Sequence, residues 1–352
     1  MTEQILKDDA ALAVLYREVG AAMPGLEKMY AFNAVSAVAH LFSINVGLPS
    51  SGKSTLLSHF NKVAFKDTSL PLFSLTIFGL KHIAGDLNGQ EKVLLIDDVG
   101  AINTMYSRVA TLSTIAYLVN DHNISELNAF TNFNISGFNG SAIANVQPHI
   151  FSSVTKDDNY VANVKDKSLR FYHFYMPKRQ EDDGYRSLDY VKINLDTHFK
   201  IFNKYEVKYK DVDKLIKLVD KLALFYSRAR SLNYAKAMSK AMALINGDHE
   251  VDESYYNTLD LMFSNFYIES RLLQRRTLDG TYTFNDDDFS LLTYYMNYDD
   301  LSFDSIIDYF DISMATMYNT VKRSSLFTEK EKTLVPLDIT KKIADTLKTP
   351  WW

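Results

Sequence analysis

Short apolar runs alternate along the chain with segments of helical spacing. Runs of strand length occupy 41–46, 73–78, 93–96, about 130–135 and 170–176. The run at 93–96 (VLLI) is apolar at every position, which indicates a strand buried on both faces. Helical patterns lie between the runs, for instance over 102–120. Strands that alternate with helices predict an α/β protein whose parallel sheet carries helices on both sides.

The pattern changes after residue 178. Residues 178–184 (KRQEDDG) are charged and rich in turn formers, so they are predicted to end the α/β core. Helical spacing dominates afterwards, with a predicted helix over 233–246 that stops at Gly247 and another from Asp252 towards Arg276. Four parts follow from these boundaries: an N-terminal helical segment (1–40), an α/β core (41–178), a linker with helices (179–280) and a C-terminal unit (281–352).

Composition narrows the class of protein. The chain of 352 residues is 47% hydrophobic and contains no cysteine, which excludes disulfides, Cys-ligated zinc and thiol catalysis. It shows no secretory signal pattern and no run of 18 apolar residues, so we expect a cytoplasmic protein without a membrane partner. The formal net charge is −5. Any nucleic-acid contact must therefore come from a local basic patch.

The segment 47–54 (GLPSSGKS) matches the phosphate-binding pattern G-x-x-x-x-G-K-[ST] at every fixed position. It follows a predicted strand and opens a predicted helix, whose N-terminus favours an anion. The glycines let backbone N–H groups point at phosphate oxygens, while the lysine reaches the β/γ-phosphates and the last serine holds Mg²⁺. The expected contacts with ATP are Gly47, Ser50, Ser51, Gly52, Lys53, Ser54 and Thr55, with Ser54 also a ligand of the Mg²⁺ ion.

Two carboxylates follow the apolar run 93–96 directly. A buried strand would deliver them to its C-terminal tip, beside the phosphate loop. We expect Asp97 to hold Mg²⁺, directly or through water, and Asp98 to orient or deprotonate the attacking water. The alternative is an acidic turn after a core strand.

With these motifs in this order, the chain resembles the AAA+ ATPases, a family of P-loop proteins with a helical lid. The resemblance implies a polar "sensor 1" at Asn139, with Ser136 and Asn134 as rivals because the strand register is open here. It also implies an arginine finger at Arg170, in Ser168-Leu169-Arg170-Phe171, that reaches the nucleotide of a neighbouring subunit. An arginine at the strand edge that makes a surface ion pair is the alternative.

Residues 229–251 resemble the lid of minichromosome maintenance helicases, and Arg230 falls on that family's "sensor 2" arginine. Two features depart from the family. Asp98 stands where a glutamate is usual, and its shorter side chain favours slow hydrolysis. The linkers 79–92 and 121–129 are short and leave little room for the DNA-pulling insertions of the helicases, which argues against a processive helicase.

The C-terminal unit has the pattern of a winged helix-turn-helix. Helices are predicted over 305–310 and 314–323, with Ser313 as the cap of the second, and 326–337 is predicted to form the wing. Side chains suited to bases or phosphates are Thr316, Tyr318, Asn319, Lys322 and Arg323. Eight aspartates and no Lys or Arg lie between 281 and 312, which favours docking on a protein instead. Trp351 and Trp352 either anchor a partner or fold back onto the core.

These features predict an oligomeric AAA+ ATPase that acts on DNA as a replication initiator, helicase loader or transposition-type regulator. ATP with Mg²⁺ would act as an assembly switch between identical subunits. Two alternatives stay open at this point. One is a MoxR-like ATPase that remodels a protein client, favoured by the acidic C-terminal unit. The other is a nucleotide-locked scaffold, suggested by Asp98.

Overall fold

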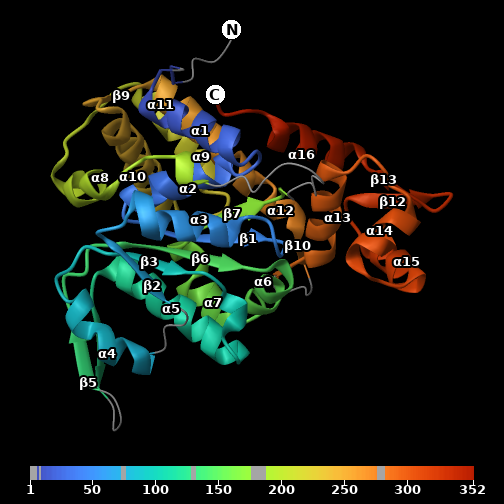
Figure 1. Ribbon diagram of the computed structural model, residues 1–352, viewed down its shortest axis with the longest axis horizontal. Coiled ribbons are helices and arrows are strands. Elements are labelled where there is room, and N and C mark those ends of the chain that lie inside the picture. Colours follow the sequence, from blue (N-terminus) through green and yellow to red (C-terminus); the bar gives the residue numbers. More distant parts are fainter. Residues whose placement is uncertain (1–5, 8, 73–76, 128–131, 176–187, 276–281) are drawn as a thin grey trace.

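Five parallel strands form the central sheet of the protein, in the order β2-β3-β6-β1-β7 (Figure 1). The structure is a computed structural model that describes residues 6–7, 9–72, 77–127, 132–175, 188–275 and 282–352. The strands are β1 (Phe42–Gly47), β2 (Ser69–Leu72), β3 (Val93–Ile96), β6 (Ser141–Val146) and β7 (Leu169–His173). The predicted α/β class with a parallel sheet is thereby confirmed.

Each face of the sheet packs against its own layer of helices, because alternate residues of a strand point to opposite faces. On β3, Val93 and Leu95 belong to one hydrophobic cluster, and Leu94 and Ile96 belong to the other. The first cluster is built with α1 (Ala11–Ala22), α2 (Glu27–Val38), α3 (Lys53–His59), α8 (Asp196–Ile201), α9 (Val212–Leu222), α10 (Arg228–Asn246) and α11 (Glu253–Tyr267). The short strands β8 (Lys208–Tyr209) and β9 (Glu250–Val251) pair beside these helices.

The second cluster contains the helices on the opposite face and extends into the C-terminal region. Its helices include α4 (Ile77–Leu87), α5 (Met105–Asp121), α6 (Pro148–Val154), α7 (Asp158–Asn163) and α12 (Glu269–Leu272). Two antiparallel hairpins lie outside the central sheet: β4 (Ile124–Leu127) with β5 (Asn132–Ile135), and β10 (Leu273–Arg275) with β11 (Tyr282–Phe284).

The C-terminal region is mainly helical. It comprises α13 (Asp286–Asn297), α14 (Phe303–Phe310), α15 (Met314–Arg323), the hairpin β12 (Phe327–Lys330) with β13 (Thr333–Pro336), and α16 (Asp338–Lys348). Helices α14 and α15 and the β12–β13 hairpin occupy the segments predicted for the winged helix-turn-helix. Ser313 caps α15 as predicted, since its side chain accepts a hydrogen bond of 3.1 Å from the Thr316 N–H. Helix α16 then returns across the molecule towards α1 (Figure 1).

The chain folds back onto the core after α16. Trp351 is 2% exposed and lies against Tyr16 of α1 and Phe171 of β7. The Lys28 Nζ donates hydrogen bonds of 2.5 Å to the Leu347 carbonyl and 2.6 Å to the Thr349 carbonyl, which satisfies acceptors at the end of α16. Of the two predictions for Trp351, packing on the core is therefore the one that the structure shows.

The helices predicted as a lid do not have a core of their own. Helix α10 packs against α1 and α2 as well as α9 and α11, within the cluster that also covers the sheet. The helices α1 and α2 and the helices α8 to α11 therefore join in one layer on one face of the sheet.

One predicted strand is misplaced, and another is present but lies outside the central sheet. The second strand was expected at 73–78, but β2 precedes it at Ser69–Leu72 and Ile77 already begins α4; residues 73–76 lie outside the described part. The strand expected at about 130–135 is β5, which belongs to a hairpin away from the central sheet, and residues 130–131 lie outside the described part. The fourth strand of the central sheet is β6 instead.

Candidate functional site

The phosphate loop leaves the C-terminal end of β1 and curls through two left-handed residues, Ser50 (φ 59°) and Gly52 (φ 88°). A Cβ on Gly52 would lie 3.1 Å from the Leu26 side chain and would be strained at this φ, so only glycine suits the position. Successive residues in αR and αL conformations turn their N–H groups towards one point, which forms a concave anion site. The backbone thus has the form expected for the sequence GLPSSGKS.

The side chains of Lys53 and His173 donate hydrogen bonds to carbonyl groups of the loop. The Lys53 Nζ donates hydrogen bonds of 2.7 Å to the Gly47 carbonyl and 2.6 Å to the Leu48 carbonyl. Burial lowers the pKa of Lys53 to about 8, although the nearby Asp98 and Asp97 oppose the shift. The His173 Nε2–H, from β7, donates to the Ser51 carbonyl at 2.8 Å, and burial lowers the pKa of His173 to about 3. The histidine is therefore a neutral support, and Lys53 is the cation available to an anionic ligand.

The acidic pair faces the same cavity as the loop. A cavity of about 850 Å³ is lined by Pro49, Ser50, Ser51, Gly52, Lys53, Ser54, Thr55, Asp97, Asp98, Asn145, Val146 and Gln147, together with Met23, Tyr175 and Asp189. Asp97 is exposed, whereas Asp98 is partly buried and accepts a hydrogen bond of 2.7 Å from the Gly100 N–H. The predicted neighbourhood of phosphate loop and carboxylates is thus present, with one oxygen of Asp98 already engaged.

A polar residue of β6 completes this group. The Asn145 Nδ2 donates a hydrogen bond of 3.2 Å to the Asp97 Oδ1, and Asn145 itself is 1% exposed. Asn145 was not among the predicted site residues, because the pattern of β6 did not indicate a strand. The signal was available in Asn145-Val146-Gln147-Pro148, where polar residues precede a proline that begins α6.

Asn139 lies at the opposite end of β6, so the structure does not support it as the sensor. Because β6 begins at Ser141 and runs parallel to β1, residues before it lie at the edge away from the loop. There the Asn139 Oδ1 lies 2.9 Å from the His40 Nδ1 and accepts from the Asn203 Nδ2 at 2.8 Å. The rivals Ser136 and Asn134 belong to the same region, bonded to Asn88 and paired in the β4–β5 hairpin respectively.

Arg170 does not extend towards a neighbouring subunit. It is 1% exposed in the middle of β7, where its Nε donates to the Glu269 Oε2 at 2.7 Å and its Nη2 to Oε1 at 3.1 Å. The guanidinium also lies over the Tyr226 ring, 4.9 Å from its centroid. A buried two-point ion pair of this kind is a structural role, so the prediction of a finger at Arg170 is corrected.

Arg230 is also held away from the loop. Its Nη1 donates a hydrogen bond of 2.7 Å to the Asn120 Oδ1, near the end of α5. Helix α5 follows β3 and crosses back over the sheet, so its last turn lies at the edge opposite the phosphate loop. The structure therefore does not bring Arg230 to the cavity of its own subunit.

The residues present fit a magnesium–polyphosphate better than a metal ion held by protein ligands alone. No group of three His, Asp or Glu side chains suited to a metal occurs within the described ranges. Mg²⁺ is usually bound through one or two carboxylates together with substrate phosphates and water. Asp97 and the exposed Ser54 hydroxyl supply such a set beside the anion loop.

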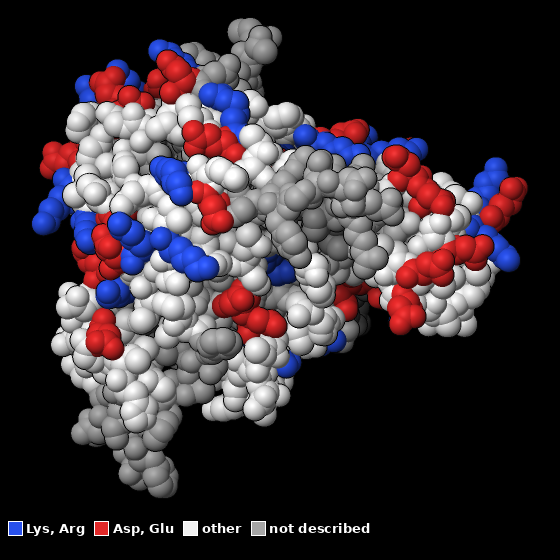
Figure 2. Space-filling model, viewed as in Figure 1, with Lys and Arg blue, Asp and Glu red and all other residues white. Residues whose placement is uncertain are grey.

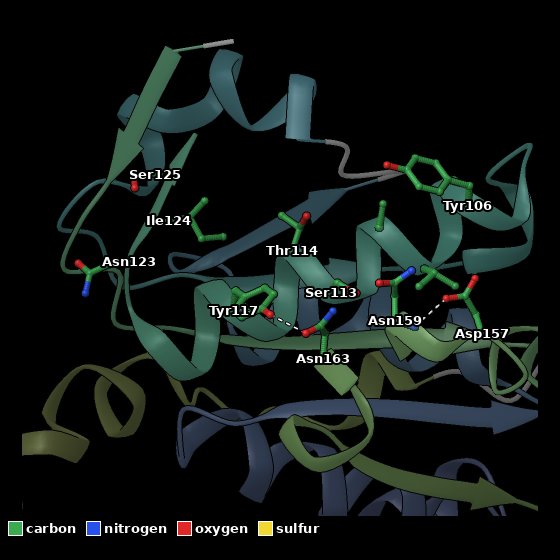
Figure 3. A pocket seen from close by; sticks show the side chains of 12 residues that line it. Tyr106, Ser113, Thr114, Tyr117, Asn123, Ile124, Ser125, Asp157, Asn159 and Asn163 are labelled. Atoms are coloured by element: carbon green, nitrogen blue, oxygen red, sulfur yellow. Dashed lines mark hydrogen bonds between the residues drawn. The ribbon is translucent and has the colours of Figure 1, made fainter. Parts of the chain in front are cut away.

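A second cavity of about 420 Å³ lies on the face covered by α5 and α7 (Figure 3). Tyr106 and Tyr117 of α5 and Asn159 and Asn163 of α7 line it, and the Tyr117 hydroxyl donates to the Asn163 Oδ1 at 2.6 Å. None of the described residues that line this cavity is Lys or Arg. A polyphosphate would therefore find no cation in the described lining of this second cavity.

Comparison with known proteins adds no family. No family model matches the chain, and neither does any curated protein. Over the residues that the structure describes, no helix is both long enough and apolar enough to cross a membrane.

Proposed function

We propose that the protein is an ATPase of the P-loop class, related to the AAA+ proteins, that binds Mg²⁺·ATP in the cavity between β1 and β3. The observation that carries this proposal is the meeting of the phosphate loop, Lys53, Asp97 and Asp98 in one cavity. These elements come from strands separated in the sheet by β6, whose Asn145 contacts Asp97.

Each residue has a separate task in this proposal. The loop N–H groups and Lys53 bind the β- and γ-phosphates, and Ser54 and Asp97 hold Mg²⁺. The metal, when bound, neutralises charge that develops on the phosphates. Asp98 orients water and accepts its proton through the oxygen that does not accept from Gly100. Asn145 takes the polar position beside the γ-phosphate in place of Asn139, and Met23 and Tyr175 also line the cavity.

The engaged oxygen of Asp98 favours slow hydrolysis. A carboxylate that caps the turn at Val99–Ala101 has less freedom to follow a water molecule. This observation keeps the nucleotide-locked scaffold as a second candidate, in which bound ATP holds an assembly together and turnover releases it rarely.

The proposed partner is DNA, bound through the C-terminal region as a winged helix. Lys322 and Arg323 are exposed on α15, although Arg323 forms an ion pair of 3.1 Å with Asp287. In the view of Figure 2, acidic side chains gather around α14 of the C-terminal unit, while basic side chains also lie over α16 and the β12–β13 hairpin. A protein client of a MoxR-like remodeller is the alternative that this acidic surface favours.

Nucleotide binding is tested with Lys53→Ala. This variant should lose affinity for a non-hydrolysable ATP analogue because the phosphates lose their cation, whereas Lys62→Ala, which alters an exposed lysine just after α3, should not. Equal affinity of the Lys53→Ala variant and the unsubstituted protein would refute the proposed site.

The partner is tested by gel shift. The protein with ATP is mixed with duplex or single-stranded DNA at two salt concentrations, and a salt-sensitive shift supports DNA. The absence of a shift at low salt supports the protein client instead.

A further inference from the structure

A row of polar side chains crosses the middle of the sheet on the face that packs against α2. Asn45 of β1 pairs in register with Asn145 of β6, and the pairing of Ile96 with Ala144 places Asp97 next along the row. Apolar residues on this face include Leu95, Ile143 and Phe171. Asn45 is fully buried, so a polar side chain here needs a hydrogen-bond partner for each of its groups.

The row is continuous from α2 to the acidic pair. The fully buried Asn33 of α2 donates its Nδ2 to the Asn45 Oδ1 at 2.9 Å. The Asn45 Nδ2 donates to the Asn145 Oδ1 at 3.0 Å, and the Asn145 Nδ2 donates to the Asp97 Oδ1 at 3.2 Å. Each amide thus accepts from the residue before it and donates to the next.

The direction of the row is fixed at both ends. The Asn33 Nδ2 also donates to the Met29 carbonyl at 2.7 Å, while the Asn33 Oδ1 accepts from the Ser43 hydroxyl at 2.9 Å. A carbonyl can only accept, so it determines which way the Asn33 amide faces. The carboxylate of Asp97 likewise requires a donor from Asn145. Reversing any amide in between would place oxygen against oxygen.

We infer that Asn33 and Asn45 are positioning residues that fix the Asn145 amide and, through it, the orientation of Asp97 for Mg²⁺. This inference rests on the proposed function, because it gives both residues a part in metal binding. Neither side chain lines the cavity. Partners that orient a metal ligand through hydrogen bonds often change metal affinity by about 10- to 100-fold when they are replaced.

Asn45→Asp is the sharpest test because it keeps the shape of the side chain. The introduced carboxylate still accepts from Asn33 but has no N–H to give Asn145, so the Asn145 amide must turn and present its oxygen to Asp97. We expect the Mg²⁺ concentration that half-saturates the complex with a non-hydrolysable ATP analogue to rise about tenfold or more. Affinity for the analogue in EDTA should stay within about twofold, because the loop and Lys53 are unchanged.

Ser141→Ala is the matched control. Ser141 lies on the same face of β6 and is fully buried, but its Oγ has no hydrogen-bond partner. A general effect of removing a buried polar group from this strand would appear here too. We expect unchanged Mg²⁺ dependence in Ser141→Ala.

Asn33→Leu keeps the test valid if Asn45→Asp does not fold. It removes the first amide of the row without touching Asn145 or Asp97, and it should raise the Mg²⁺ requirement in the same direction. Unchanged Mg²⁺ dependence in a folded Asn45→Asp protein, or in Asn33→Leu if only that variant folds, would overturn the inference. An equal loss of affinity with and without Mg²⁺ would also overturn it, since that pattern indicates a general defect.

A second readout separates this inference from the proposed function. The side-chain amide resonances of Asn145 are recorded by NMR in the protein without nucleotide, where they should shift in Asn45→Asp and Asn33→Leu but not in Ser141→Ala. If the unsubstituted protein binds no ATP analogue, the proposed function fails while shifted resonances still support the row as the device that orients Asn145. Resonances that do not move overturn the inference itself.

Discussion

At the scale of single residues, burial decides what the charged groups of the site can do. Lys53 is nearly enclosed and its pKa is lowered to about 8, so it is close to losing its proton in the range where most proteins work. An anionic ligand would stabilise the protonated form and raise this pKa. The proposed binding of a nucleotide should therefore depend on pH.

This coupling gives a measurable pH profile. Between pH 7 and pH 9 the protonated fraction of a group with a pKa of about 8 falls by about tenfold. Affinity for a non-hydrolysable ATP analogue should fall by a similar factor over that range, at constant ionic strength and Mg²⁺, as measured by calorimetry. A flat profile would show that Lys53 keeps its proton throughout.

Asp98→Asn separates binding from turnover. The amide keeps the shape of the side chain and its oxygen can still accept from Gly100, but it cannot take a proton from water. We expect ATP to bind with little change and hydrolysis to fall by about 10²–10⁴-fold, measured as phosphate release. Normal turnover would remove Asp98 from the chemistry.

Replacing Arg170 is expected to lower the stability of the fold as its main effect. Its partner Glu269 is buried, with a side chain only 4% exposed, so Arg170→Met leaves an unpaired buried carboxylate. Loss of about 3–5 kcal/mol in the free energy of unfolding is expected from denaturant titration. The double variant Arg170→Met with Glu269→Met should recover much of it. If Arg170→Met is as stable as the unsubstituted protein, the ion pair is not formed.

At the scale of elements, the sequence pattern predicted correctly those elements that have a continuous apolar run or a fixed motif. The strand at Val93–Ile96 and the loop after β1 were located because a continuous apolar run and fixed glycines leave few alternatives. The strand β6 (SAIANV) was missed because its small and polar residues conceal a strand buried at every position. The buried Asn145 is tolerated there through hydrogen bonds to Asn45 and Asp97, which a linear pattern does not show.

The sequence pattern also did not indicate which distant residue or strand an element contacts. Ser168-Leu169-Arg170-Phe171 fits a finger motif, yet Glu269, the residue that decides the role of Arg170, lies 99 positions further on. The run 73–78 has strand-like composition, but β2 precedes it, where Ser69–Leu72 pairs with β3. Long-range pairing overrode local preference in both places.

The return of the chain after α16 should stabilise the whole molecule. Trp351 fills a site between α1 and β7, so Trp351→Ala removes a large buried ring. A loss of about 3–5 kcal/mol is expected in denaturant unfolding. Tyr190→Ala, which alters a ring that is 86% exposed, is the control and should change stability little. Similar small effects for both would show that the Trp351 contact is not maintained in solution.

At the scale of the whole molecule, DNA contact through the C-terminal region would have to overcome its acidic surface. Lys322→Glu with Arg323→Glu should weaken DNA binding and reduce the slope of log affinity against log salt by about two, as two phosphate contacts are lost. The proposed ATPase activity should not change in the absence of DNA, because neither residue lines the cavity at the phosphate loop. Full DNA affinity in this variant would move the contact to another part of the protein.

The strand order also has a consequence for how the molecule forms. Strand β1, which leads into the phosphate loop, has β6 and β7 as its neighbours in the sheet. Asn45 of β1 contacts Asn145 of β6, which lies 100 positions further along the chain. During synthesis, β1 leaves the ribosome long before either neighbour exists. Closing so large a loop delays pairing, because the entropy must be lost before the contacts form. Until then the unpaired backbone N–H and C=O groups along both edges of β1 are open to other chains. The proposed nucleotide pocket is also not yet assembled, so a nucleotide could not assist folding through it.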